Sequence, residues 1–231
     1  MRAMILAAGR GERMRPLTDS RPKPLLEAGG QALIVWNIQK LLAAGIKQIM
    51  INHAWLGQQI EAQLGDGSQW GASLHYSAEN PALETAGGIA KALPFFQNQR
   101  FLVINADVWT DWDAAQAHTM ANELAPDDMA QLVLVPNPEH HPKGDFNLAP
   151  HMPYIQEQPT SSSQRYTFSG IGVYDPRLFN QLVPEQSIKM ATLLHQAIGQ
   201  QHVQARLHTG VWMDIGTPER LAQLERHLET L

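Results

Sequence analysis

The chain has 231 residues, of which 44% are hydrophobic and 17% are charged. This balance is ordinary for a globular protein and excludes general disorder. The formal net charge is −5, so the composition predicts neither a nucleic-acid partner nor an anionic membrane surface. The chain has no cysteine, which excludes disulfides, zinc–thiolate sites and thiol catalysis. No apolar run approaches the ~20 residues that span a membrane, and no signal-peptide pattern is seen, so we expect a soluble cytoplasmic protein, as a monomer or small homo-oligomer.

The first predicted element is a buried β-strand over the apolar run Ala3 to Ala7. A glycine-rich and arginine-rich loop follows up to Thr18, and the segment Pro22-Lys23-Pro24-Leu25 comes shortly after it. Glycine lets the backbone approach a ligand closely, and consecutive backbone N–H groups in such a turn bind anions. The basic residues of this stretch are Arg10, Arg13, Arg15, Arg21 and Lys23. We therefore predict that the loop holds a polyphosphate.

Two common phosphate-binding motifs do not match this loop. A P-loop requires Gly-Lys followed by Ser or Thr, which is absent here. The dinucleotide fingerprint requires a third small residue where the chain has Met14, and a helix that begins at once. The complete array is more specific than a bare Gly-x-Gly: a strand, Gly-x-Gly-x-Arg-x-x-Pro-Leu-Thr, and then Pro-Lys-Pro-Leu.

Strands and helices alternate through the rest of the first half. The pattern predicts helices at 32–44, 56–64 and 88–93, and strands at 48–52, 73–76 and 101–104. This order indicates an α/β fold, in which helices cover both faces of a predominantly parallel mixed sheet in a Rossmann-like three-layer arrangement. Ligands of such sheets bind beyond the carboxyl ends of the strands.

The second half is less regular. It predicts strands at 132–135, 166–174 and 211–213, and helices at 177–182, at 188–199 and from Pro218. The segment 136–159 is rich in proline and histidine and has only short strand candidates. Since we find no internal repeat, charge block or linker, we expect a single domain over residues 1–231.

Two aspartates follow predicted strands far apart in the sequence. Asp107 comes after the strand 101–104, and Asp214 lies in Trp212-Met213-Asp214-Ile215-Gly216-Thr217-Pro218. Each could simply cap a helix, although Thr217 fills that position better before Pro218. Beside a phosphate loop, however, two carboxylates at the carboxyl edge of a sheet suit Mg²⁺, which binds a few carboxylates together with phosphate oxygens and water.

The two motifs and these aspartates resemble the signature of the sugar-phosphate nucleotidyltransferases, and the resemblance extends over essentially the whole chain. It implies that residues 1–110 bind a nucleoside triphosphate and that residues 111–231 bind a sugar 1-phosphate. By the same resemblance, Arg13, Lys23 and Asp107 are catalytic, the first two through the phosphates, and Asp107 and Asp214 hold a catalytic Mg²⁺. The reaction chemistry agrees with this family: its nucleophile is an ionised phosphate, which needs no catalytic triad, and the sequence shows none.

The resemblance also implies the remaining ligand contacts. The expected nucleotide-binding residues are Leu6, Ala8, Gly9, Gly11, Arg13, Lys23, Glu79, Thr85 and Gly87. The expected sugar-phosphate-binding residues are Asn105, Gly144, Glu157, Ser169 and Lys189. The family has a lysine where this chain has Gln158. A simpler interpretation of the segment around Thr85 is a loop that leads into a helix.

The segments at 52–57, 83–88 and 107–111 are most similar to the N-acetylmuramate-1-phosphate uridylyltransferases of bacterial cell-wall recycling, which favours UTP as the nucleotide. Guanylyl transfer to mannose 1-phosphate and thymidylyl transfer to glucose 1-phosphate stay open. A non-catalytic nucleotide-binding module is another possibility. A glycosyltransferase is a further one, because Asp111-Trp112-Asp113 matches the Asp-x-Asp pattern of those enzymes.

Overall fold

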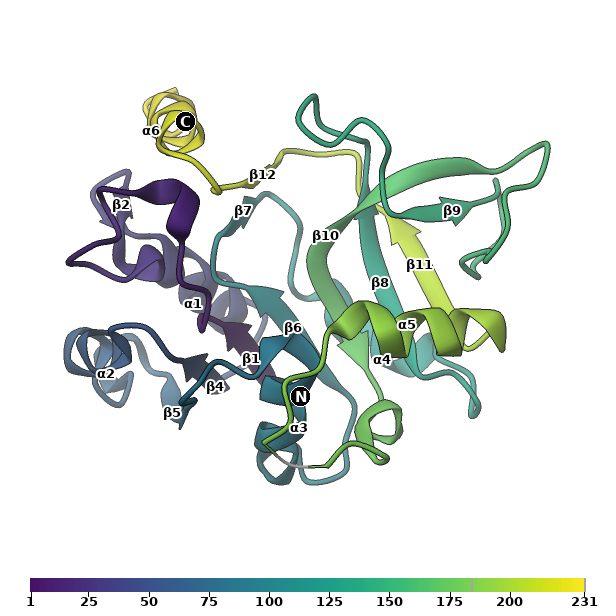
Figure 1. Ribbon diagram of the computed structural model, residues 1–231, viewed down its shortest axis with the longest axis horizontal. Helices are drawn as coiled ribbons and strands as arrows, with labels where there is room; N and C mark the ends of the chain where they lie inside the picture. The colour runs from purple at the N-terminus through teal and green to yellow at the C-terminus, as the bar shows by residue number, and fades with distance from the viewer. Residues whose placement is uncertain (184, 231) are drawn as a thin grey trace.

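The computed structural model describes residues 1–183 and 185–230. Its centre is a mixed sheet formed by β1 (Ala3–Leu6), β4 (Gln48–His53), β5 (Ser73–Ala78), β6 (Phe101–Asn105), β8 (Ala130–Val135), β9 (Phe146–Leu148), β10 (Gln164–Tyr174) and β11 (Val203–Leu207). The strand order is β11-β8-β10-β6-β1-β4-β5, and β9 pairs with β10 (Figure 1).

Most neighbouring strands of the sheet are parallel. β5, β4, β1 and β6 run in one direction, and β11 is parallel to β8. β10 is antiparallel to both of its main neighbours, β6 and β8. The chain passes from β1 to β4 and β5 on one side and returns to β6 on the other. The strand order therefore reverses between β1 and β6, which is where ligands bind in sheets of this kind.

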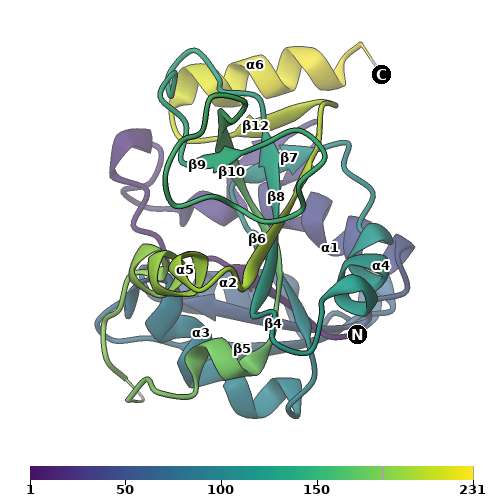
Figure 2. The ribbon, with the colours of Figure 1, turned by 90° about the vertical axis from the view of Figure 1, so that its right-hand side faces the viewer.

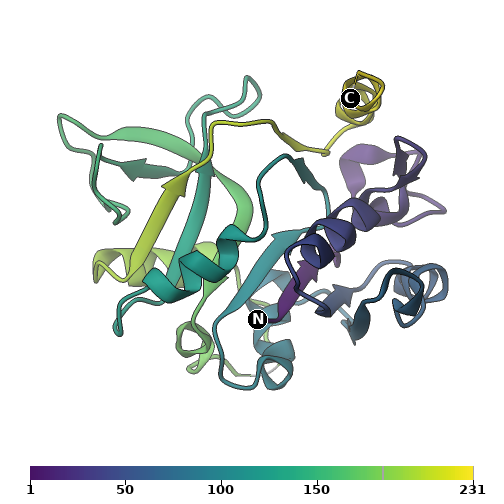
Figure 3. The same cartoon turned by 180° about the vertical axis from the view of Figure 1, so that it is seen from behind.

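Helices cover both faces of the sheet, as predicted. They are α1 (Leu33–Ala43), α2 (Gly57–Leu64), α3 (Glu84–Phe96), α4 (Gln116–Glu123), α5 (Met190–Gly199) and α6 (Pro218–Leu228). α3 and α5 are in front of the sheet in Figure 1, whereas α1 and α4 are in front in the reverse view of Figure 3. Successive residues of β1 point to opposite faces of the sheet: Ile5 belongs to the hydrophobic core that contains Ile38 of α1, and Met4 belongs to the core that contains Ile89 of α3.

A third, smaller core joins the C-terminal helix to the glycine-rich loop. It contains Met14, Leu33, Ile215 and Leu224, all of which are buried. α6 lies beside β12 (Trp212–Asp214), which pairs with β7 (Val108–Thr110) at one end of the molecule (Figure 2). β2 (Glu27–Ala28) and β3 (Gln31–Ala32) form a small separate hairpin. None of the described helices has the length and apolar character that a membrane span requires.

Several elements differ from their predicted bounds. α3 extends over 84–96 instead of 88–93, because the polar residues before Gly88 already form its first turn and Pro94 is accepted near its end. The predicted helix at 177–182 is a 3₁₀ helix, η4 (Pro176–Phe179). The sequence pattern does not predict α4, β7 or β11. In α4 the buried residues are Ala117 and Met120 alone, which is too few to produce a helical hydrophobic pattern.

Candidate active site

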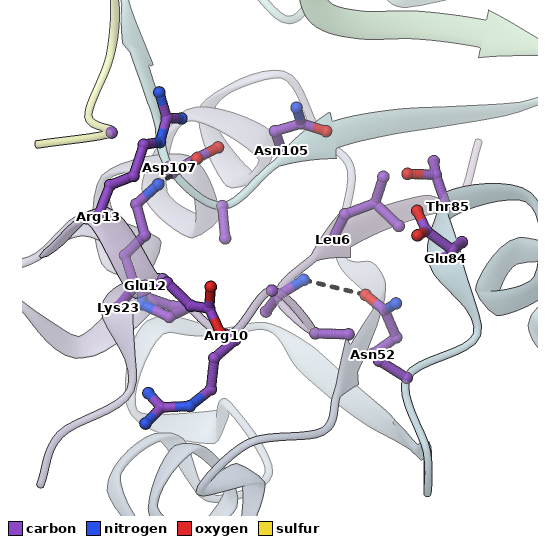
Figure 4. Close-up of a pocket in the computed structure, with 18 residues that line it drawn as sticks. Leu6, Arg10, Glu12, Arg13, Lys23, Asn52, Glu84, Thr85, Asn105 and Asp107 are labelled. Carbon is purple, nitrogen blue, oxygen red and sulfur yellow. Dashed lines mark hydrogen bonds and ion pairs between the residues drawn. The ribbon is translucent and has the colours of Figure 1, made fainter. Parts of the chain in front are cut away.

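A cavity of about 590 Å³ lies at the carboxyl ends of β1, β4 and β6. The predicted nucleotide-binding residues that line it are Leu6, Ala8, Gly9, Gly11, Arg13, Lys23 and Thr85. Arg13, Lys23 and Asp107 lie on one side of it, and Thr85 and Glu84 lie on the other (Figure 4). The cavity therefore has a cationic end and an end formed by the start of α3.

The glycine-rich loop is held by its own side chains. Gly11 has a φ of +68°, and a Cβ atom there would lie 3.1 Å from both Lys23 Cβ and Thr18 Cγ2. The buried Thr18 donates a hydrogen bond from Oγ1 to the Gly11 oxygen (2.8 Å) and accepts one at its own oxygen from Arg10 Nη1 (3.0 Å). The Arg10 guanidinium lies 3.7 Å from the centre of the Trp55 ring. These contacts within the protein fix the conformation of the loop, and a preorganised loop lowers the entropic cost of binding a ligand.

Lys23 and Asp107 form an ion pair at the bottom of the cavity. The Lys23 side chain is 11% exposed and the Asp107 side chain is 34% exposed. Asp107 lies in the turn between β6 and β7, and the buried Asn37 of α1 donates to the Val108 oxygen (3.1 Å) and to the Asn105 oxygen (3.4 Å) on either side of it. α1 therefore fixes the turn that carries the Asp107 carboxylate.

A second cavity of about 320 Å³ opens on the other side of Asp107. It shares Arg13, Asn105 and Asp107 with the first cavity. Its other lining residues are Val108, His140, His141, Thr167, Phe168, Ser169, Gly170, Trp212 and Asp214. Within residues 1–183 and 185–230, Arg13 has no carboxylate within ion-pair distance, so its charge is available to a ligand at the junction of the two cavities.

The structure brings Asp107 and Asp214 to the same cavity through the antiparallel β7–β12 pair. Asp214 is opposite Val108 in this ladder, and the Ile215 N–H donates to the backbone oxygen of Asp107 (2.7 Å). Both Asp214 carboxylate oxygens accept from Arg220 Nη1 (2.6 Å), and Oδ1 lies 2.9 Å from His140 Nε2. In the described part of the chain, no three acidic or histidine side chains gather into a metal site made by protein alone. Two carboxylates beside the cationic Arg13 and Lys23 nevertheless fit Mg²⁺ with a phosphate ligand, because this ion takes its remaining ligands from phosphate and water.

Several of the predicted ligand residues lie outside the two cavities. Gly87 is buried in α3, where a Cβ atom would overlap the backbone oxygen of Gln186, so its small size serves packing. Glu79 is 4% exposed, and both of its oxygens bind other protein groups. Gly144, Glu157 and Lys189 line neither cavity.

Ser169 does line the second cavity, but its hydroxyl is already engaged by the protein. Its Oγ donates to the Val133 oxygen (2.7 Å) and accepts from the Ile171 N–H (3.2 Å), at the irregular register of β10. Gly170 has a φ of +78°, and a Cβ atom there would lie 2.6 Å from the Asn105 amide nitrogen. The Ser169-Gly170 segment thus stabilises the bulge and makes room for Asn105.

Other lining residues were not predicted. Asn52 lines the first cavity, and its place at the end of β4, next to β1 in a parallel sheet, is a signal that the strand-end rule could have used. His140 and His141 lie in the proline- and histidine-rich segment 136–159, and they line the second cavity. The Asp111-x-Asp113 pair lines neither: Asp111 lies 2.8 Å from His208, and Asp113 accepts from the Ala115 N–H in the turn before α4.

A mixed, mostly parallel sheet with a basic glycine loop and two adjoining cavities suits an enzyme that joins a nucleotide to a second phosphate. The sequence model of the nucleotidyl transferase family matches residues 2–230, and the chain belongs to this family. The chain is 49% identical, over 97% of its length and 97% of the relative's length, to an N-acetylmuramate alpha-1-phosphate uridylyltransferase from Neisseria meningitidis.

More distant similarity reaches other members of the family. The chain is 27% identical, over 94% of its length, to a mannose-1-phosphate guanylyltransferase from Mycobacterium tuberculosis, of which it spans 61%. A crystal structure from Bacillus anthracis, assigned as a glucose-1-phosphate thymidylyltransferase, superposes with a TM-score of 0.84 over 100% of this chain and 96% of the other. At 23% identity, that match confirms the fold.

Proposed function

We propose that the chain transfers the uridylyl group of UTP to N-acetylmuramic acid 1-phosphate, giving UDP-N-acetylmuramic acid and pyrophosphate, as a cytoplasmic step of peptidoglycan recycling. The observation that carries this proposal is the 49% identity, over 97% of both chains, to the Neisseria uridylyltransferase. The identity to the Mycobacterium guanylyltransferase is 27%. Uridylyl transfer is therefore the better-supported activity.

The proposed reaction is a direct displacement. A phosphate oxygen of the sugar 1-phosphate, which is already ionised at neutral pH, attacks the α-phosphorus of UTP. A bond forms between these two atoms, and the bond from the α-phosphorus to the oxygen bridging to the β-phosphate breaks. Pyrophosphate leaves with that electron pair. No proton is abstracted, so the enzyme needs alignment and charge neutralisation and does not need a general base.

The two cavities suit this displacement because they meet at the charged residues Arg13 and Asp107, which line both of them. In this assignment the first cavity takes UTP, with the uracil toward Thr85 and the triphosphate toward the cationic end. Arg13 neutralises the pyrophosphate, and Lys23 holds the α-phosphate and the incoming phosphate. The second cavity takes the sugar, beside Asn105 and Trp212. Positive groups that are fixed before the reaction stabilise the developing charge without reorganisation.

Asp107 and Asp214 would hold Mg²⁺ in this proposal. The bound ion would supply positive charge to the nucleotide phosphate oxygens. We expect EDTA to abolish turnover and excess Mg²⁺ to restore it. Asp214→Asn should raise the Mg²⁺ concentration needed for half-maximal rate by about 10-fold or more, because one anionic ligand is lost. An Asp214→Asn enzyme with an unchanged Mg²⁺ requirement would remove this residue from the metal site.

Pyrophosphate release tests the proposal directly. We would combine UTP, dTTP, GTP and CTP in turn with the 1-phosphates of N-acetylmuramic acid, N-acetylglucosamine, glucose and mannose, in the presence of Mg²⁺. Turnover confined to UTP with N-acetylmuramic acid 1-phosphate supports the proposal. Turnover with another pair refutes the substrate assignment and keeps the reaction. Folded protein that binds a nucleotide and turns over no pair would be a non-catalytic module.

A further inference from the structure

A buried polar relay connects the two walls of the first cavity. Asn52 is 2% exposed and Glu79 is 4% exposed. The Ala7 N–H donates to Asn52 Oδ1 (3.0 Å), and Asn52 Nδ2 donates to Glu79 Oε1 (2.7 Å). The other carboxylate oxygen, Glu79 Oε2, accepts from the Leu83 N–H (2.8 Å). The first of these hydrogen bonds is drawn in Figure 4.

The two ends of this relay belong to opposite walls. Ala7 directly follows β1 and begins the glycine-rich loop, and both Ala7 and Ala8 line the cavity. Leu83 precedes Glu84 and Thr85, which line the other wall at the start of α3. The relay therefore links the loop that would hold the phosphates to the wall that would hold the base.

The relay is packed tightly against α3 at Gly88. A Cβ atom on Gly88 would lie 2.5 Å from Glu79 Oε1 and 2.8 Å from Asn52 Nδ2. Only a glycine at this place in α3 lets the helix pack against the two side chains. The relay also uses both Glu79 oxygens, and Glu79 does not line the first cavity.

The chemistry of the relay restricts which side chains can form it. Each end is a backbone N–H, which only donates, so the side-chain atom facing each end must be an oxygen. In the middle, the two side chains must then present one N–H and one oxygen to each other. An amide paired with a carboxylate meets these conditions in either order. Two amides place two donors together somewhere in the relay, and two ionised carboxylates place two acceptors together.

We propose that Asn52 and Glu79 are a positioning pair for the nucleotide: they fix the spacing of the phosphate loop and the base wall, and they act without contacting the reacting atoms. The proposal rests on the proposed function only in taking a nucleoside triphosphate as the ligand of the first cavity. It assigns to Glu79 an effect on nucleotide affinity that passes through the Leu83 backbone.

The test compares the wild type with N52D, E79Q and the double variant N52D/E79Q. N52D places two acceptors in the middle of the relay, and E79Q leaves two donors facing each other. In the double variant, the new carboxylate at position 52 accepts from Ala7 and from the new amide at position 79, and the oxygen of that amide accepts from Leu83. Every hydrogen bond is then restored with the order exchanged, and the net charge equals that of the wild type. The exposed N122D in α4 is the control for an asparagine-to-aspartate change.

We expect each single variant to raise the KM for UTP, and the Kd of UTP measured by calorimetry, by about 10-fold or more, since a buried group is left unsatisfied. The KM for the sugar 1-phosphate should stay within about 2-fold, because the second cavity is not touched by the relay. The double variant should return to within about 3-fold of the wild type in the Kd of UTP, and its Tm should recover as well.

Three outcomes would overturn the positioning pair. They are an E79Q variant that binds UTP normally, a double variant no better than the single variants, and a Tm that recovers while the Kd does not. The last would show a structural role alone. Wild-type protein that fails to turn over UTP would refute the proposed function instead, and the Kd of whichever nucleotide binds would still decide the pair across the same proteins.

Discussion

Lys23 is the cation of the first cavity that is most enclosed by protein. Its side chain is 11% exposed, compared with 26% for Arg10 in the glycine-rich loop. It follows Pro22, which is extended, and it begins the 3₁₀ helix η2 (Lys23–Leu25), so its backbone is fixed on both sides. Its Nζ is paired with Asp107. An ammonium group held in this way interacts with phosphate through less water than an exposed lysine does.

We expect Lys23→Met to lower kcat by about 10²-fold or more while the protein stays folded, because a fixed positive charge at the reacting phosphates is lost. The methionine retains an apolar stem of similar length. The matched control is Lys47→Met. Lys47 is exposed and directly precedes β4, at the end of this strand that is away from the cavity, so this variant should retain full activity. Initial rates of pyrophosphate release and a thermal melt are sufficient. A Lys23→Met enzyme with near-normal kcat would exclude this lysine from the mechanism.

At the level of single elements, α3 depends on a close backbone approach. The N–H groups of Ala86 and Gly87 both donate to the Ile188 oxygen, at 3.0 and 3.3 Å. The approach requires a glycine, since a Cβ atom on Gly87 would overlap the Gln186 oxygen. Because the overlapping atom belongs to the backbone, no flexible side chain could move aside to make room for the Cβ atom. The first turn of α3, which carries Thr85, is thus held against the segment before α5.

Gly87→Ala should therefore shift this turn, reduce the free energy of unfolding by about 1–3 kcal/mol and raise the KM for UTP. The matched control is Gly199→Ala at the end of α5, where the nearest atom to a new Cβ is 3.7 Å away. That substitution should be neutral or stabilise the protein by up to about 1 kcal/mol, since alanine is the better helix former. Urea denaturation measures the free energy of unfolding of both variants, and initial rates measure the KM for UTP. Equal effects of the two substitutions would refute the packing argument.

A second element-level feature joins the end of β10 to the start of β6. Asp175 is 8% exposed and accepts from Arg177 Nε (2.8 Å) and Arg100 Nε (3.3 Å). Arg100 also donates to the backbone oxygens of Ala121 and Leu124 at the end of α4. Burial by itself raises the pKa of the Asp175 carboxyl, but the hydrogen bonds from Arg177 and Arg100 outweigh burial and lower this pKa overall.

A carboxyl group whose pKa is lowered by folding stabilises the protein above its unfolded pKa of about 3.9, and that contribution is lost as the pH falls through the folded pKa. We expect Asp175→Asn to reduce the free energy of unfolding at neutral pH by about 2 kcal/mol. The difference from the wild type should shrink below about pH 4. Urea titrations at several pH values measure this, with the exposed Glu139→Gln as control. A pH-independent difference would contradict the assignment.

For the molecule as a whole, strongly patterned features could be predicted from the sequence. The glycine-rich loop and Asp107 lie together because the parallel strands β1 and β6 end at the same edge of the sheet, and the antiparallel β7–β12 pair brings Asp214 there. The sugar side could not be predicted as well. Segment 136–159 has no hydrophobic period, and its position depends on the pairing of the three-residue β9 with β10, which no local pattern marks. The relay was also missed, because an isolated Asn and Glu have no pattern before the fold brings them together.

The sheet also determines how the chain should unfold. β10 comes from the second half of the sequence, yet it lies between β6 and β8, with Ile171 opposite both Ile104 and Val133. Residues 1–110 and 111–231 therefore share one sheet, and we propose that they form a single cooperative unit. We expect one urea transition, identical by far-UV circular dichroism and by the fluorescence of the six tryptophans, which lie in both halves.

Unfolding in the presence of a nucleotide distinguishes one cooperative unit from two separate units. UTP at 100 times its Kd should add about 2.7 kcal/mol to the free energy of unfolding. If the two halves are one unit, the whole transition moves by that amount in both signals, including the part reported by Trp212 in β12. If they are separate units, UTP moves only the portion that contains the glycine-rich loop, and the two signals no longer coincide. Since β10 hydrogen-bonds to β6 along four register positions, unfolding either half alone would expose an unpaired strand edge, which opposes a separate transition.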